Sequence, residues 1–131
     1  SIAPDIAPKY GMLGTTFGGN QLACAAMTAV AEVIERDGLV ANAKDMGDYL
    51  ISELVKIDGI KDVRGRGLMI GIEFDFDTSE LRRELLFEER VFVGSSGKNI
   101  VRLLPALNIT REHADMALEA IKRQIAKLSG I

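Results

Sequence analysis

The stretch KDVRGRGLMIGIEF, residues 61–74, decides the fold of this 131-residue chain. Its second half places apolar and other residues in strict alternation, and a period of two puts successive side chains on opposite faces of a strand. The apolar set of that alternation is Leu68, Ile70, Ile72 and Phe74. Glycines at the centre separate two strand segments, KDVRG and LMIGIEF, which predicts neighbouring strands with one apolar face.

Two amphipathic helices are predicted before this stretch. Asn20 is a good N-cap residue, and apolar residues at helical spacing continue from it to about Arg36, where Asp37-Gly38 stops the pattern. A second helix is predicted from Leu39 to Ile57, ended by Asp58-Gly59. Pro4 and Pro8 predict an extended segment at the start of the chain.

The segments after residue 74 complete the predicted architecture. They predict a short helix over 79–88, a hairpin of 91–93 with 100–104 around GSSGKN, and a final helix from an N-cap at Thr110 to about residue 128. The order helix, helix, strand, strand, helix, strand, strand, helix indicates an α+β fold. We expect a two-layer domain with a mostly antiparallel sheet and helices packed on it.

Composition excludes several classes of function. Acidic residues outnumber basic ones 19 to 16, and no stripe of Lys and Arg predicts a nucleic-acid or lipid surface. The longest apolar run is too short to cross a bilayer. A single cysteine, Cys24, excludes an internal disulfide, and a cytoplasmic location is expected. The chain begins at Ser1 without Met, which indicates a piece of a longer protein.

Familiar motifs fail when their spacing is counted. Gly65, Gly67 and Gly71 do not match a dinucleotide fingerprint, and a strand follows where a helix is needed. GSSGK at 94–98 is too short for a P-loop, and the acidic segment from Asp75 lacks the glycine and final acid of a calcium loop. The one histidine, His113, is expected to be a surface residue. No metal site is predicted.

The loop GMLGTTFGG, residues 11–19, permits two interpretations. Backbone N–H groups, the positive end of the following helix and the hydroxyls of Thr15 and Thr16 would suit a phosphate. Alternatively, Gly18 and Gly19 only allow a tight turn while polar side chains cap the helix. Spacing alone leaves both interpretations open.

Arg102 is unusual in the apolar segment NIVRLLP, where Ile100, Arg102 and Leu104 are expected to share one packed face. A buried guanidinium requires a carboxylate partner, because its desolvation costs several kcal/mol. The partner is either an internal acid, with Glu73 on a neighbouring strand as the candidate, or the carboxylate of a substrate. Both alternatives remain open from the residues alone.

Three segments together resemble a known family. LGTTFGGNQLACAAMTAVAEVIE, VRGRGLMIGIEF and VRLLPALNIT, in this order and spacing, are similar to the C-terminal third of class III pyridoxal-phosphate aminotransferases, with acetylornithine aminotransferases as the most similar group. The resemblance covers nearly the whole chain. It implies the C-terminal small domain of a fold-type I transferase: residues 1–19 as a remnant of the large cofactor-binding domain, 20–37 as an interdomain helix, and 38–131 as the small domain.

The resemblance also implies roles for individual residues. Thr16, with Thr15 beside it, would donate to the phosphate of a pyridoxal phosphate held by the neighbouring subunit of a homodimer, and Arg102 would bind the α-carboxylate of the substrate. The Schiff-base lysine and the aspartate at the pyridinium nitrogen belong to a large domain that would precede Ser1. Lys98, in a polar turn, does not replace that lysine. The chain is therefore expected to hold no catalytic residue and to be inactive alone.

The reaction implied for the intact enzyme moves the δ-amino group of N-acetylornithine to 2-oxoglutarate, a step of arginine biosynthesis. Leu13, Gln21 and Ala106 depart from the family's usual residues. Succinylornithine, ornithine and 4-aminobutyrate aminotransferases therefore remain alternatives. A further alternative is a non-catalytic α+β module that binds a small molecule, because a fold alone does not determine function.

Overall fold

The computed structural model describes residues 9–11 and 14–129. The chain divides into two compact units, Ser1–Asp37 and Gly38–Ile131, and each is described by itself. The predicted extended segment with Pro4 and Pro8, and the family departure at Leu13, lie outside the described residues.

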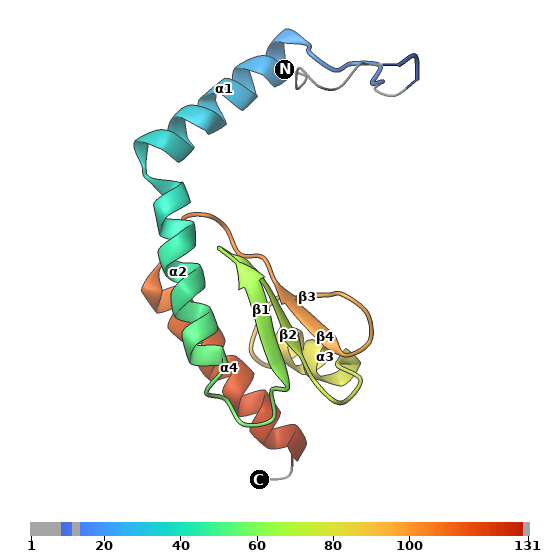
Figure 1. Ribbon diagram of the computed structural model, residues 1–131, viewed down its shortest axis with the longest axis vertical. Helices are drawn as coiled ribbons and strands as arrows, with labels where there is room; N and C mark the ends of the chain where they lie inside the picture. Colours follow the sequence, from blue (N-terminus) through green and yellow to red (C-terminus); the bar gives the residue numbers. More distant parts are fainter. Residues whose placement is uncertain (1–8, 12–13, 130–131) are drawn as a thin grey trace. The chain divides into compact units, whose positions relative to one another are not determined.

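The first unit contains helix α1, Gln21–Arg36 (Figure 1). The Asn20 side-chain oxygen accepts a hydrogen bond from the Ala23 N–H at 2.9 Å, and its amide donates to the Phe17 carbonyl at 2.7 Å. The predicted N-cap is thus confirmed. No residue of α1 is buried, and large apolar side chains such as Leu22 and Met27 are exposed. Within the described part of this unit, nothing covers the apolar face of the helix.

The second unit is built on a four-stranded sheet. Strands β1 (Asp62–Arg66), β2 (Met69–Glu73), β3 (Gly94–Ser95) and β4 (Ile100–Leu103) lie in the order β1-β2-β4-β3, and all neighbours are antiparallel. Gly67, with φ of +56°, makes the tight turn between β1 and β2 possible. The strand pair predicted from residues 61–74 is confirmed.

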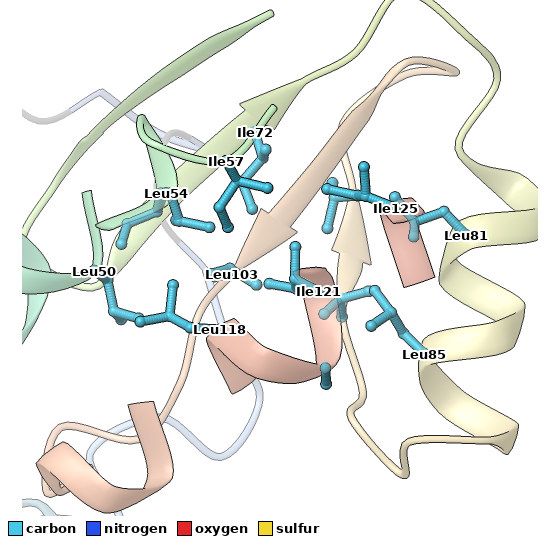
Figure 2. Packing of buried hydrophobic residues seen from close by; sticks show 14 of the residues in the cluster. Leu50, Leu54, Ile57, Ile72, Leu81, Leu85, Leu103, Leu118, Ile121 and Ile125 are labelled. Carbon is cyan, nitrogen blue, oxygen red and sulfur yellow. The ribbon is translucent and has the colours of Figure 1, made fainter. Parts of the chain in front are cut away.

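Three helices cover one face of this sheet: α2 (Leu39–Leu54), α3 (Ser79–Phe87) and α4 (Arg111–Ser129) (Figure 1). Figure 2 shows the apolar side chains that fill the space between the two layers. The main members of this core are Leu50, Leu54, Ile70, Ile72, Phe74, Leu81, Leu85, Val101, Leu103, Leu118, Ile121 and Ile125. The two-layer α+β fold is therefore as predicted, and none of the helices described in this unit lies on the opposite face of the sheet.

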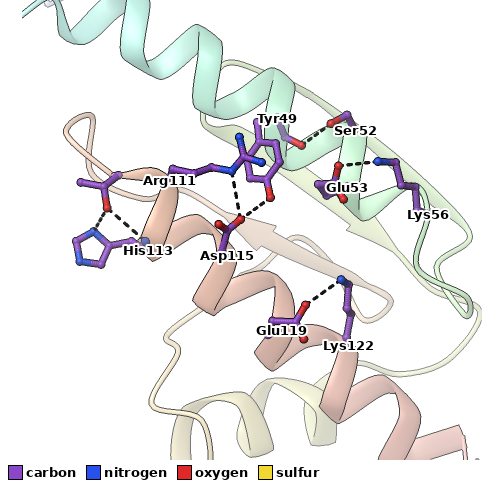
Figure 3. A network of polar contacts seen from close by, with 10 residues as sticks. Tyr49, Ser52, Glu53, Lys56, Arg111, His113, Asp115, Glu119 and Lys122 are labelled. Carbon is purple, nitrogen blue, oxygen red and sulfur yellow. Dashed lines mark hydrogen bonds and ion pairs between the residues drawn. The ribbon is translucent and has the colours of Figure 1, made fainter.

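Polar groups join α2 to α4 beside the core (Figure 3). The Tyr49 hydroxyl donates to Asp115, which also accepts from Arg111 Nε at 3.3 Å, and the Arg111 guanidinium carbon lies 3.2 Å from the centre of the Tyr49 ring. At the start of α4, the Thr110 hydroxyl accepts from the His113 N–H at 3.3 Å, so the second predicted N-cap is confirmed. His113 is exposed, as expected.

The predicted end of α2 is wrong by one turn. The helix ends at Leu54 rather than Ile57. Lys56 N–H donates to the Glu53 carbonyl at 3.2 Å and Ile57 N–H to the Leu54 carbonyl at 3.1 Å, and such i→i−3 bonds tighten the chain beyond a helix end. This turn still brings Ile57 into the core, which is why its spacing looked helical.

The predicted strand over 91–93 is also wrong. Pairing with β4 begins only at Gly94, inside the segment predicted as a turn. Arg90 takes a left-handed conformation with φ of +57°, and the Val91 N–H donates back to the Leu85 carbonyl of α3 at 2.8 Å. Residues 91–93 therefore leave α3 as an irregular segment, and Val93 is buried.

Candidate functional site

The glycine loop before α1 exposes both threonines of interest. Thr15 and Thr16 are open to solvent, and their hydroxyls make no hydrogen bond to another described residue. The Thr15 methyl lies against Gly18, where a Cβ atom would collide with it, and Gly19 has φ of +74°. The glycines thus serve the tight turn, while the hydroxyls remain available.

The donors at this loop suit a phosphate group. Asn20 occupies the N–H of Ala23, but no described residue accepts from the N–H groups of Gln21 and Leu22 at the start of α1. These N–H groups, the positive end of the helix and the hydroxyls of the neighbouring loop form a donor set of the kind that binds phosphate. The residues therefore fit the phosphate of the cofactor that the resemblance implies.

Arg102 lies on the face of the sheet opposite to the core, which corrects the expectation of a packed face. In β4, Val101 and Leu103 point into the core, whereas Arg102 and the following Leu104 are exposed. Buried and exposed positions along β4 are therefore exchanged relative to the prediction. A solvated guanidinium on an open face needs no internal partner, so Arg102 does not require a buried ion pair.

Glu73 is not the partner of Arg102. Arg64 Nη1 lies 2.7 Å from one Glu73 oxygen and Lys61 Nζ lies 3.3 Å from the other. Hydrogen bonds from Arg64 and Lys61 hold the pKa of the Glu73 carboxyl below its ordinary value. Within the described residues, Arg102 forms no ion pair. Its guanidinium is available to a carboxylate that comes from elsewhere.

The surroundings of Arg102 leave room for such a carboxylate. Its Cα partners on both neighbouring strands are glycines, Gly71 on β2 and Gly94 on β3. Arg102 borders a hollow of about 400 Å³ on the open face, together with Arg66. Sequence reasoning missed these glycines, because only the strand register shows that they flank the arginine.

Other candidate chemistry finds no support among residues 9–11 and 14–129. No group of three or more His, Cys, Asp or Glu side chains there could hold a metal ion. Cys24 is exposed on α1. None of the helices described is long and apolar enough to cross a membrane. The threonines belong to the first unit and Arg102 to the second.

Comparison with known proteins gives a consistent result. The sequence profile of the family "Aminotransferase class-III" matches residues 3–125. The chain is 44% identical over 115 residues to acetylornithine aminotransferase 1 of Bordetella bronchiseptica, covering 85% of this chain and 29% of that protein. It is 43% identical over 115 residues to the ornithine aminotransferase of Staphylococcus carnosus, covering 86% of this chain and 29% of the relative.

Solved structures agree with these sequence matches. The ornithine aminotransferase of Toxoplasma gondii matches with a TM-score of 0.81 and 29% identity, covering 94% of this chain and 31% of that one. The acetylornithine aminotransferase of Elizabethkingia anophelis matches with a TM-score of 0.76 and 35% identity, covering 93% and 33%. The chain thus spans about a third or less of these relatives. On its sequence profile, its relatives and its fold, this chain belongs to the class III aminotransferases.

Proposed function

We propose that this chain is the C-terminal portion of a pyridoxal-phosphate-dependent aminotransferase that uses N-acetylornithine as amino donor and 2-oxoglutarate as acceptor. The observation that carries the proposal is the guanidinium of Arg102, which is exposed on the open face of the sheet and unpaired within the described residues. Family membership supports the reaction class, and relatives named acetylornithine or ornithine aminotransferase support an ornithine-type donor.

Arg102 is proposed to bind the α-carboxylate of the donor and, in the second half of the reaction, a carboxylate of 2-oxoglutarate. A guanidinium pairs two carboxylate oxygens with parallel N–H bonds, which fixes both the position and the orientation of a substrate. Since no acid among the described residues pairs with it, the side chain need not give up such an ion pair when the substrate arrives. It acts by binding and orienting the substrate.

Thr16, with Thr15 beside it, is proposed to bind the cofactor phosphate across a homodimer interface. Pyridoxal phosphate, when bound, supplies the electron sink that lets an amino group leave one carbon skeleton and join another. One Toxoplasma gondii ornithine aminotransferase structure carries this cofactor at partial occupancy at its active site. The threonine hydroxyls and the free N–H groups at the start of α1 would hold the phosphate in place by hydrogen bonds.

The domain organisation belongs to the same proposal. Residues 1–19 are assigned to the edge of a large cofactor-binding domain, 20–37 to an interdomain helix and 38–131 to the small domain. The uncovered apolar side chains of α1, Leu22 and Met27 among them, support this assignment, because such a surface is normally covered in a complete protein. The Schiff-base lysine would lie in the large domain, and a cytoplasmic role in arginine biosynthesis completes the proposal.

The carboxylate role is tested with Arg102→Ala in the complete gene product. An ion pair with hydrogen bonds contributes about 1.5–3 kcal/mol, so KM for both substrates should rise roughly ten- to 150-fold while bound cofactor is unchanged. Arg83→Ala is the matched control, because it removes an exposed guanidinium from α3, which does not border the hollow beside Arg102. Normal KM values for Arg102→Ala would contradict the assigned role.

The cofactor role is tested with Thr16→Val, which removes the hydroxyl at nearly constant volume. The variant should lose cofactor faster on dialysis, as measured by the absorbance of the bound cofactor, and Thr16→Ser should restore retention. Thr28→Val controls for loss of a threonine hydroxyl, because Thr28 donates to the Cys24 carbonyl within α1. Equal cofactor retention by Thr16→Val and the unmodified protein would remove Thr16 from the site.

A further inference from the structure

The open face of the sheet carries three arginines that border the same hollow. Residues two apart in a strand share a face, and residues paired across antiparallel strands also lie on one face. Arg64 pairs with Gly71, and Gly71 pairs with Arg102, so all three lie on the open face. Arg66 lies there too, two residues after Arg64 in β1. The three arginines are exposed, and each of them borders the hollow of about 400 Å³.

Two of these three arginines have no acidic partner. Arg64 Nη1 lies 2.7 Å from a Glu73 oxygen and 2.5 Å from an Asp62 oxygen. Within the described residues, Arg66 and Arg102 form no ion pair, and no Asp or Glu among them borders the hollow. The hollow therefore has two positive charges that no acid of the described chain neutralises. A ligand with two negative charges would match this number.

The positions of Arg66 and Arg102 suit a ligand with one charge at each end. Two strand spacings and two residues along a strand separate them, so their Cα atoms lie about 12 Å apart. A five-carbon dicarboxylate measures about 5 Å between its carboxyl carbons, and a hydrogen bond to a guanidinium adds about 4 Å at each end. Such a ligand therefore spans nearly the same distance.

The surface between the two arginines suits the middle of such a ligand. Gly71 lies between them on β2, and a Cβ atom built there would meet only Ile100 Cγ2 at 3.6 Å and the Arg64 carbonyl at 3.8 Å. The lack of a side chain thus leaves room above the sheet. Met69, two residues earlier on β2, is exposed and borders the hollow, so it offers an apolar contact to methylene groups.

We propose that Arg66 is a specificity-determining residue: with Arg102 it binds the two carboxylates of the acceptor 2-oxoglutarate, one at each end of the hollow. The inference rests on the proposed role of Arg102 as a carboxylate anchor. N-acetylornithine has a single carboxylate and needs Arg102 alone. A 2-oxo acid with one carboxylate, such as pyruvate, gains no ion pair from Arg66 and is therefore the poorer acceptor.

The test measures kcat/KM of the complete gene product for 2-oxoglutarate, pyruvate and N-acetylornithine. Arg66→Ala should lower the value for 2-oxoglutarate about ten- to 150-fold, as expected when a charge-assisted hydrogen bond is lost, and keep the other two within about twofold. Arg66→Lys retains the charge and should recover part of the loss. Arg83→Ala is the control and should keep all three values, because Arg83 is exposed on α3 and does not border the hollow.

A binding measurement tests the same role without turnover. Glutarate has the two carboxylates of 2-oxoglutarate, whereas pentanoate has the same number of carbons and one carboxylate. In calorimetric titrations of the complete gene product, glutarate should bind more tightly than pentanoate, and Arg66→Ala should remove this difference. Urea unfolding of each variant checks that the fold is retained. A difference that persists in Arg66→Ala would overturn the role of Arg66.

The results for the two arginines distinguish this inference from the proposed function. If Arg102→Ala weakens both substrates and Arg66→Ala leaves 2-oxoglutarate unchanged, the role of Arg66 is overturned while the proposed function stands. If Arg66→Ala weakens N-acetylornithine as much as 2-oxoglutarate, selection of the dicarboxylate is overturned, because the effect does not depend on a second carboxylate. If Arg102→Ala leaves both substrates unchanged, both proposals are overturned.

Discussion

Gly47→Ala tests how closely α2 packs against the turn between β1 and β2. Gly47 is buried in the middle of α2, and a Cβ atom there would overlap the backbone of Gly67, with only 2.8 Å to its Cα. The turn at Gly67 is fixed by the pairing of Arg66 with Met69 and by its own positive φ, so this backbone cannot move easily. The substitution therefore forces α2 away from the β1–β2 turn.

The expected magnitude follows from two opposing effects. Replacing glycine by alanine in a helix interior stabilises the helix by about 1 kcal/mol. Overpacking against backbone costs about 3 kcal/mol at the upper end of its usual range, so the net loss should be about 2 kcal/mol. Urea unfolding of the 131-residue chain, followed by circular dichroism, measures it, and Gly71→Ala serves as control. A Gly47→Ala chain as stable as the unmodified one would refute the close contact of α2 with Gly67.

Two other predictions concern the segment after α3. Arg123 and Gln124 donate hydrogen bonds to Glu89, and these bonds lower the pKa of the Glu89 carboxyl from 4.5 to about 2. The ionised carboxylate therefore stabilises the fold fully above pH 4.5, and this stabilisation is lost as the pH falls towards 2. The urea concentration at the midpoint of unfolding should fall over this pH range. Glu89→Gln should make this fall shallower, whereas Glu88→Gln should not. Arg90→Gly should stabilise the chain by about 1 kcal/mol, because φ of +57° is unfavourable for residues with a Cβ atom. Arg90→Ala should bring no such gain in the same urea unfolding experiment. An equal gain would contradict the explanation by the positive φ of this residue.

Local sequence signals predicted the elements that obey them. The alternation through Ile70 and Ile72 gave the central strand and its buried face correctly, and the caps at Asn20 and Thr110 marked true helix starts. These signals depend on residues that are close to one another in the sequence, so a single sequence is enough to recognise them. The helices and the central strand pair were predictable for this reason.

The errors have a common physical origin in tertiary packing. Residues 91–93 have strand-like side chains, but the hydrogen bond from Val91 to Leu85 and the conformation of Arg90 hold them away from β4. The face of Arg102 was predicted from its neighbours Ile100 and Leu104, yet Val101 and Leu103 supply the buried face. A short strand with apolar residues on both faces does not reveal which face the helices cover.

The most direct test of the carboxylate site is a crystal structure of the complete gene product with 2-oxoglutarate or N-acetylornithine bound. We expect a substrate carboxylate within hydrogen-bond distance of the Arg102 guanidinium. A substrate carboxylate held by other residues, with the Arg102 guanidinium paired to an acid of the protein, would contradict the proposed function.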